Sequence, residues 1–401
     1  MTVTPTPEAP PRTTAAPPSR TVQRLLLGAA GWSLAQLLIA LRWLLDPGSW
    51  PGFDDDGRVG LLAVLHRVPS AWALIGLAAA GLLLAALATR RPASRAVAGA
   101  LAVQTGLLLV VSADVGVLTL LGYLCAIVGP AAFLVVFLVG AVRARRARPW
   151  LLGVLALVVA GVASGVLRPG TVGRLAGELG DGFARHAGPP AHLGLVLVGA
   201  ALFGTAAVLL RRAATGRCRA CGRPGARWTE PDAVRRWSRI ATWTAVAGPL
   251  PYALVRMTWL TPWPLGMPEG GDLEPAMRLF GLGLGFAALG GAVLTAGLVR
   301  PWGEVWPGWV PVLRGRPVPV AVPVLAGGLV ATVLLVSTPG MVALAVEGIG
   351  DEDPMGWLML LVFPTLPWGL ALAAAVTGYA LRRRGTCRSC GRGEPARPVG
   401  A

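Results

Sequence analysis

The stretch TLPWGLALAAAVTGYALRRRGTCRSCGR (Thr365–Arg392) joins the two features that decide the fold, an apolar helix and a cysteine motif. It belongs to an apolar run over residues 356–381. That run meets the length of roughly 20 residues that a transmembrane helix needs. Three arginines end the run, as is usual where a helix leaves the bilayer on the cytoplasmic side. The sequence therefore predicts a membrane helix that carries a C-x-x-C motif at its cytoplasmic end.

The whole chain has the composition of a membrane protein. Of its 401 residues, 54% are hydrophobic and 14% are charged, and the mean hydropathy is +0.64, which is too apolar for an ordinary soluble protein. We expect an all-α, polytopic transmembrane helix bundle of about ten spans. They lie at residues 25–44, 70–89, 96–112, 116–141, 150–167, 192–210, 240–260, 277–299, 319–341 and 356–381.

The arginines predict how the chain is oriented. With the N-terminus inside, the cytoplasmic segments contain 28 arginines and 5 acidic residues, whereas the outer segments contain 6 arginines and 14 acidic residues. Because arginine accumulates on the cytoplasmic side, we expect a multi-pass plasma-membrane protein with both termini in the cytoplasm. The formal net charge of +17 then indicates attraction to anionic inner-leaflet lipids. We expect no nucleic-acid partner, because the basic clusters lack stacking aromatic residues.

Six segments follow from this pattern. Residues 1–22 are rich in Pro, Thr and Ala without an apolar period, so we expect a disordered N-terminal tail. Membrane helices 1–4 occupy residues 23–148 (repeat unit A), and helices 5 and 6 occupy residues 149–210. The remaining segments are a cytosolic loop with the first cysteine motif at 211–239, helices 7–10 at 240–381 (repeat unit B), and a cytosolic C-terminal tail with the second motif at 382–401.

Units A and B resemble each other in sequence. The first span ends in ALRWLLDPGSWPG (Ala40–Gly52) and the seventh in ALVRMTWLTPWPLG (Ala253–Gly266), while the fourth contains IVGP (Ile127–Pro130) and the tenth LVFP (Leu361–Pro364). Two four-helix units of the same orientation would follow. Such parallel repeats occur in transporters, but they also arise when a structural unit is duplicated.

Two arginines, Arg42 and Arg256, lie near the outer ends of apolar runs in units A and B. Snorkelling of a long side chain to the membrane surface explains them. The functional alternative pairs Arg42 with Asp114 and Arg256 with Glu347, as gates or anion contacts.

The cysteine motif is itself duplicated. LLRRAATGRCRACGRP (Leu209–Pro224) follows the sixth span and ALRRRGTCRSCGRGEP (Ala380–Pro395) the tenth, and both contain C-R-x-C-G-R. Cytosolic thiols stay reduced, and C-x-x-C before glycine turns two thiolates toward one tetrahedral ion. We predict a structural zinc site with the ligands Cys218, Cys221, Cys387 and Cys390. Thiol redox chemistry and unliganded cysteines are the alternatives, and pairing within one chain or between two subunits stays open.

Signs of a catalytic site are missing from the sequence. The three histidines, His66, His186 and His192, fall on the predicted outer side, without H-E-x-x-H, G-x-S-x-G or a phosphate-binding glycine loop. We expect a non-enzymatic membrane scaffold or assembly factor, whose zinc module and basic loops organise a cytosolic protein partner. The alternative is a small-molecule transporter or permease built on the four-helix repeat.

Two longer segments carry a resemblance. IATWTAVAGPLPYALVRMTWLTPWPLG (Ile240–Gly266) and LTAGLVRPWGEVWPGWVPVLRGRPVP (Leu294–Pro319) resemble a family of uncharacterised multi-pass membrane proteins from high-GC actinobacteria. In that family a tryptophan-glycine-glutamate loop and a G-R-x-V-P turn join two spans. The lysine-free composition, rich in Ala, Gly, Arg and Pro, fits such a source. The resemblance implies a membrane topology and no particular activity.

Overall fold

The computed structural model describes residues 20–53, 60–122, 188–225, 227–261, 263–266, 275–308, 313–350 and 355–393, together with single residues between 152 and 181. Within these ranges the chain is helical and forms no β-strand. Six described helices are long and apolar enough to cross a membrane, which confirms the prediction of an all-helical membrane-embedded protein. They are Arg20–Leu45, Arg67–Arg90, Gly188–Ala214, Met277–Val299, Ala321–Val346 and Leu358–Arg382.

The other predicted spans differ in how far the structure describes them. The span predicted at 96–112 is a shorter apolar helix, α4 (Arg95–Val111). The span predicted at 240–260 is divided between two helices. The spans predicted at 116–141 and 150–167 lie largely outside the described residues. The count of ten spans therefore stays a prediction.

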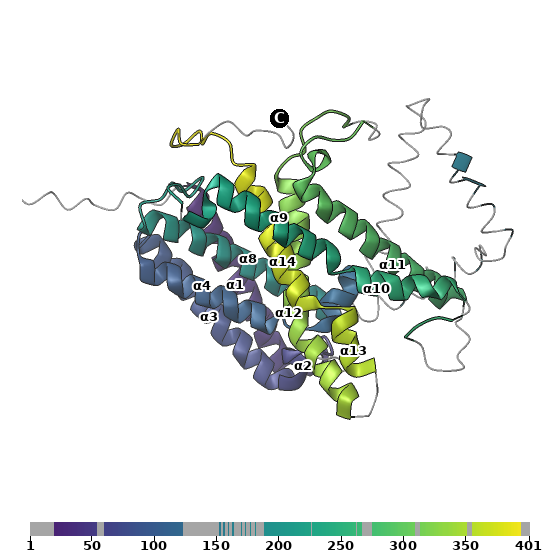
Figure 1. Ribbon diagram of the computed structural model, residues 1–401. Coiled ribbons are helices and arrows are strands. Elements are labelled where there is room, and N and C mark those ends of the chain that lie inside the picture. Colours follow the sequence, from purple (N-terminus) through teal and green to yellow (C-terminus); the bar gives the residue numbers. More distant parts are fainter. Residues whose placement is uncertain are drawn as a thin grey trace, which may run out of the picture.

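The N-terminal bundle contains α1 (Arg20–Leu45), α3 (Arg67–Arg90), α4 and α8 (Gly188–Ala214), with the short α2 (Leu61–Leu65) before α3. α1 packs on α3 and α8, and α4 packs on α3 and α8 (Figure 1). Close packing depends on small residues facing large ones. A Cβ atom at Gly199 of α8 would lie 2.4 Å from the ring of Trp32, whose indole nitrogen donates to the carbonyl of Leu195 at 2.7 Å. Glycine at position 199 thus lets α1 and α8 approach.

The C-terminal bundle contains two broken helices. α9 (Pro231–Ala247) continues after a break at Gly248 and Pro249 as α10 (Leu250–Met257), and α13 (Met355–Val362) continues after Pro364 as α14 (Thr365–Arg382). Proline lacks the amide hydrogen of a regular helix, so both breaks fall where the sequence requires them. α14 packs between α9 and α12 (Ala321–Gly350), while α11 (Pro275–Ala296) packs on α9 and α10.

α14 repeats the buried face of α8 in the same register. Six of the seven buried positions of α14 lie 169 residues after a buried position of α8, and the same separation joins Cys218 to Cys387. The pairs are Phe203 and Leu372, Ala206 and Ala375, Ala207 and Val376, and Leu210 and Tyr379. Of the described helices, α8 thus matches α14. The fourth predicted span, which the sequence pairs with the tenth, lies largely outside the described residues.

Candidate metal centre

The loop after α8 is a tight knuckle built by backbone hydrogen bonds. The amide of Cys218 donates to the carbonyl of Arg223 at 2.9 Å, and the amide of Gly222 donates to the carbonyl of Cys218 at 2.7 Å. The loop after α14 has the same two bonds at equivalent positions, at 3.0 and 2.8 Å. The glycine after each second cysteine has a positive φ, 75° at Gly222 and 68° at Gly391, a conformation that favours glycine. The C-x-x-C-G motif therefore folds alike in both loops.

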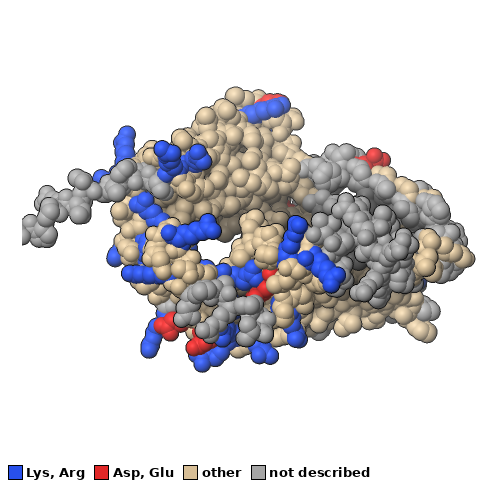
Figure 2. All heavy atoms as spheres, turned by 90° about the horizontal axis from the view of Figure 1, so that it is seen from above, with Lys and Arg blue, Asp and Glu red and all other residues tan. Residues whose placement is uncertain are grey.

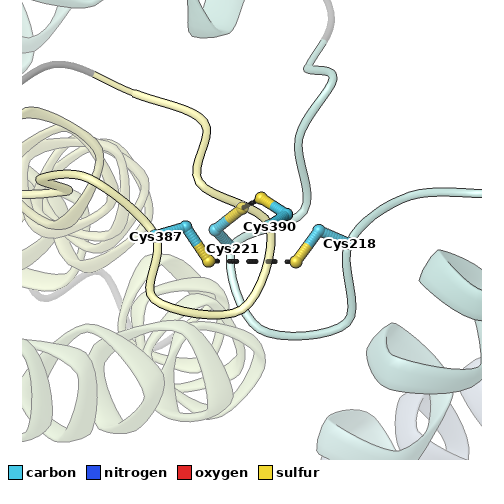
Figure 3. A group of neighbouring side chains, drawn as sticks. All are labelled: Cys218, Cys221, Cys387 and Cys390. Atoms are coloured by element: carbon cyan, nitrogen blue, oxygen red, sulfur yellow. Dashed lines mark hydrogen bonds between the residues drawn. The ribbon is translucent and has the colours of Figure 1, made fainter.

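The two knuckles face each other and bring the four predicted ligands together (Figure 3). The sulfur atoms of Cys218 and Cys387 are 3.9 Å apart and those of Cys221 and Cys390 are 3.6 Å apart. All four sulfurs lie within 4.8 Å of one another. A tetrahedron with metal–sulfur bonds of about 2.3 Å has an edge of about 3.8 Å, so the cluster has the dimensions of a four-sulfur metal site. In this structure the four cysteines converge within one chain.

Arginines fasten the two knuckles to each other. Arg223 of the first knuckle donates from its guanidinium to the carbonyls of Gly385, Arg392 and Arg384, at 3.1, 2.6 and 3.2 Å. Arg384 in turn donates to the carbonyl of Cys221, a cysteine of the first knuckle. We name this set of crossing bonds, made by Arg223 and Arg384, the arginine clasp. It holds the two loops in place without using the thiols.

A third arginine supports the first knuckle from its own helix. Arg212, in the last turn of α8, donates to the carbonyls of Arg219 and Ala220 at 3.0 and 3.3 Å. Burial lowers the pKa of Arg384, and repulsion from Arg223 and Arg212 lowers it further. Three guanidinium groups thus gather beside the sulfur cluster, where an anionic centre is electrostatically favoured.

The thiols do not titrate alike. Hydrogen bonds from the backbone amides of Ser389 and Cys390 lower the pKa of Cys387 to about 6. For Cys390 the amide of Arg392 acts to lower the pKa, but desolvation and the hydrogen bonds with the other thiols outweigh it and raise the pKa to about 11. A backbone hydrogen bond from Cys221 also lowers the pKa of Cys218, so the backbone favours thiolates at the first cysteine of each knuckle, whereas Cys390 resists loss of its proton unless a cation compensates the charge.

The tryptophan-glycine-glutamate loop supports the end of α14 beside the metal centre. The hydroxyl of Tyr379 donates to the carbonyl of Gly303 at 2.8 Å. Arg383 lies 3.7 Å from the carboxylate of Glu304, a residue that is only 4% exposed, and it also donates to the carbonyl of Val318 at 3.0 Å. This loop fixes the direction in which the chain enters the second knuckle.

The two arginines near the outer ends of spans have local partners. Arg42 forms an exposed ion pair with Asp46 at 3.8 Å, so the structure gives it a different carboxylate from the predicted Asp114. The guanidinium of Arg256 lies over the ring of Trp259, 4.1 Å from its centroid, and donates to the hydroxyl of Tyr252 at 3.0 Å. The predicted partner of Arg256, Glu347, has a side chain outside the described set.

Comparisons with known proteins add no assignment. Neither a protein family nor a curated protein nor a solved structure matches this chain. The resemblance to an actinobacterial membrane protein family stays a prediction.

Proposed function

We propose that this chain is a non-enzymatic membrane scaffold or assembly factor whose cytoplasmic side is organised by a structural zinc ion. The observation that supports this is the convergence of Cys218, Cys221, Cys387 and Cys390, with all sulfurs within 4.8 Å. The four cysteines come from the ends of two helices in different bundles. An ion bound there holds the two bundles in a fixed relation at one end.

Zinc suits this donor set better than other common metals. Four thiolates in a small tetrahedral cluster favour zinc or an iron–sulfur centre, and oxygen-seeking ions such as magnesium and calcium are excluded. A single ion fits because the sulfur–sulfur distances of 3.6 and 3.9 Å match one tetrahedron. Four protein ligands leave no open position for substrate, which is typical of a structural site. Zinc with four thiolates has a net charge of −2, and the neighbouring arginines compensate it.

The orientation is part of the proposal. Figure 2 looks onto the end of the molecule where the knuckles lie, and arginine side chains gather there with few acidic ones. This end would face the cytoplasm, since arginine marks that side. A cysteine added at Asp54 or Asp351 should react with an impermeant thiol reagent in intact cells, and one at Glu394 should not. The parent chain is the blank, and labelling at Glu394 would reverse the orientation.

Metal content is the direct test. Protein purified under reducing conditions without chelator should contain about one zinc per chain by elemental analysis. The double variant Cys218→Ser, Cys221→Ser should contain none and should still insert in the membrane, because insertion depends on hydrophobicity. Cys125→Ser is the matched control, because it removes the one cysteine outside the cluster. Wild-type protein without metal would overturn the zinc assignment, and one with iron and sulfide would replace it.

One observation favours the alternative, a small-molecule transporter. Inside the N-terminal bundle, Gln36 lies 3.2 Å from the ring nitrogen of His192, and both are buried. The amide oxygen of Gln36 and the hydroxyl of Ser33, one helical turn away, are buried without a hydrogen-bond partner. Such atoms are satisfied if water enters the bundle. Rapid reaction of a Ser33→Cys variant with a water-soluble thiol reagent would favour transport, and protection would favour the scaffold.

A further inference from the structure

An apolar groove lies on the surface of the C-terminal bundle, between α14 and the segment at the start of α9. It is lined by Trp228, Trp237, Ala373, Ala374 and Thr377, and its volume is about 460 Å³. The volume falls in the range of about 300 to 1,000 Å³ that is typical of small-molecule sites. The groove is separate from the sulfur cluster, so it is not part of the metal centre.

The floor of the groove belongs to a membrane span. Ala373 and Ala374 lie in the span Leu358–Arg382, and Ala373 is nine residues before the arginine that ends it. At about 1.5 Å per residue this is about 14 Å, or roughly the thickness of one leaflet of the hydrocarbon core. The groove therefore opens to the leaflet on the arginine-rich side.

Two tryptophans form the wall at the membrane surface. Their ring centroids are 6.2 Å apart, and the indole nitrogen of Trp237 donates to the carbonyl of Trp228 at 2.9 Å. A Cβ atom at Gly378 of α14 would lie 2.2 Å from the Cβ of Ser238 and 3.2 Å from the ring of Trp237, so glycine at this position lets α9 approach α14. Trp228 is 56% exposed. Tryptophan at this depth is typical of the boundary between acyl chains and headgroups.

The segment that carries both tryptophans of the groove is rich in arginine. The stretch RWTEPDAVRRWSR (Arg227–Arg239) contains both tryptophans, four arginines and two acidic residues. The arginines are exposed. An anionic headgroup beside this segment would be electrostatically favoured.

We propose that this groove binds one anionic phospholipid, with an acyl chain on Ala373 and Ala374 and the headgroup phosphate among the arginines around Trp228. An apolar groove alone gives no preference for a bound lipid, because the surrounding acyl chains are equally apolar. The selectivity must therefore come from charge at the mouth, and arginines near the membrane surface attract anionic headgroups. The proposal uses the membrane location of the protein and does not depend on zinc.

The test is lipid retention by the full chain. Protein is placed in nanodiscs with equal amounts of phosphatidylglycerol and phosphatidylcholine and then extracted in mild detergent, and the co-purified lipids are quantified by mass spectrometry. We expect the wild-type protein to retain about five times as much anionic as neutral lipid. This ratio corresponds to the attraction between one arginine near the membrane surface and an anionic headgroup. The variant Ala374→Leu fills the groove and should lose this excess. Arg235→Gln with Arg236→Gln should abolish the headgroup preference.

Trp243→Ala is the matched control. Trp243 lies on the same helix α9, is 40% exposed and does not line the groove, so this variant should retain lipid as the wild type does. Equal thermal midpoints of the variants would show that the groove variant is folded. Equal retention of the two lipids by wild-type protein would overturn the proposal. Full anionic retention by Ala374→Leu would do the same.

Discussion

Replacement of Arg223 by alanine tests whether the arginine clasp, in addition to the thiols, builds the metal centre. The guanidinium of Arg223 makes three hydrogen bonds to carbonyls of the second knuckle, at 2.6 to 3.2 Å. A hydrogen bond from a charged donor contributes about 1.5 to 3 kcal/mol when buried. These bonds are partly or fully exposed, so we take about 2 kcal/mol for the set, which is about 30-fold in an equilibrium constant. Without the clasp, zinc itself must hold the loops together.

We therefore expect Arg223→Ala to raise the zinc dissociation constant about 30-fold. The assay is competition for zinc between the reduced, detergent-solubilised protein and a chromophoric chelator. The chain offers a matched control in Arg392, which has the same place in the second C-R-x-C-G-R motif. Arg392 contributes its backbone carbonyl, which accepts from Arg223 and from the amide of Cys387. Because Arg392→Ala keeps that carbonyl, it should change the affinity much less.

The comparison separates charge from geometry. Each variant removes one positive charge near the four sulfurs, so an effect of charge alone would weaken zinc binding equally in both. Equal dissociation constants for Arg223→Ala and Arg392→Ala would refute the reasoning about the clasp. So would an unchanged constant in Arg223→Ala.

Three further outcomes check other parts of the structure. Gly199→Ala should lower the stability by about 1 to 3 kcal/mol in thermal unfolding in detergent, because the new Cβ meets the indole of Trp32 at 2.4 Å. The control Gly194→Ala, where nothing lies within 4 Å of the new Cβ, should leave the stability unchanged. Glu304→Ala should cost about 2 kcal/mol by the same measurement, since it leaves a mostly buried arginine without its carboxylate, and an unchanged midpoint would contradict the role of that loop. In metal-free reduced protein, alkylation followed by peptide mapping should modify Cys387 half-maximally near pH 6, because a lowered pKa makes the thiolate present above that pH. Cys390 should resist alkylation until about pH 11, and the reverse order would contradict the assigned hydrogen bonds.

The sequence predicted the helical membrane fold because hydrophobic length is a local property. Residues 25–44 and 70–89 needed no tertiary information to be recognised as spans, and they became α1 and α3. What local pattern could not supply was the partner of each helix. Arg42 pairs with Asp46, four residues later and directly after the end of α1, and not with Asp114, the partner in the functional alternative, since a carboxylate so near in the chain needs no further folding to reach it.

The four cysteines were predictable for the same reason, because each C-x-x-C-G motif forms its knuckle within six residues. The convergence of the two knuckles in space was not predictable from local pattern, since 166 residues separate Cys221 from Cys387. The two arginines of the clasp were missed, and the motif itself could not have identified them. Arg223 and Arg392 are equivalent in sequence, yet only the first reaches across with its side chain. That choice depends on how the two loops are placed in space.

The register of α8 and α14 explains why the knuckles meet at one height. The buried positions that α8 and α14 share are 169 residues apart in the sequence. The same 169 residues separate Cys218 from Cys387 and Cys221 from Cys390. A helix packed at a given depth therefore delivers its knuckle to a given level above the membrane. Two such helices in one membrane place their knuckles at the same level. The distance between the knuckles in the plane of the membrane is then the one quantity that the packing of each helix does not set. We infer that the packing of the spans positions the sulfurs, and that the arginine clasp and the metal then fix the distance between the two loops.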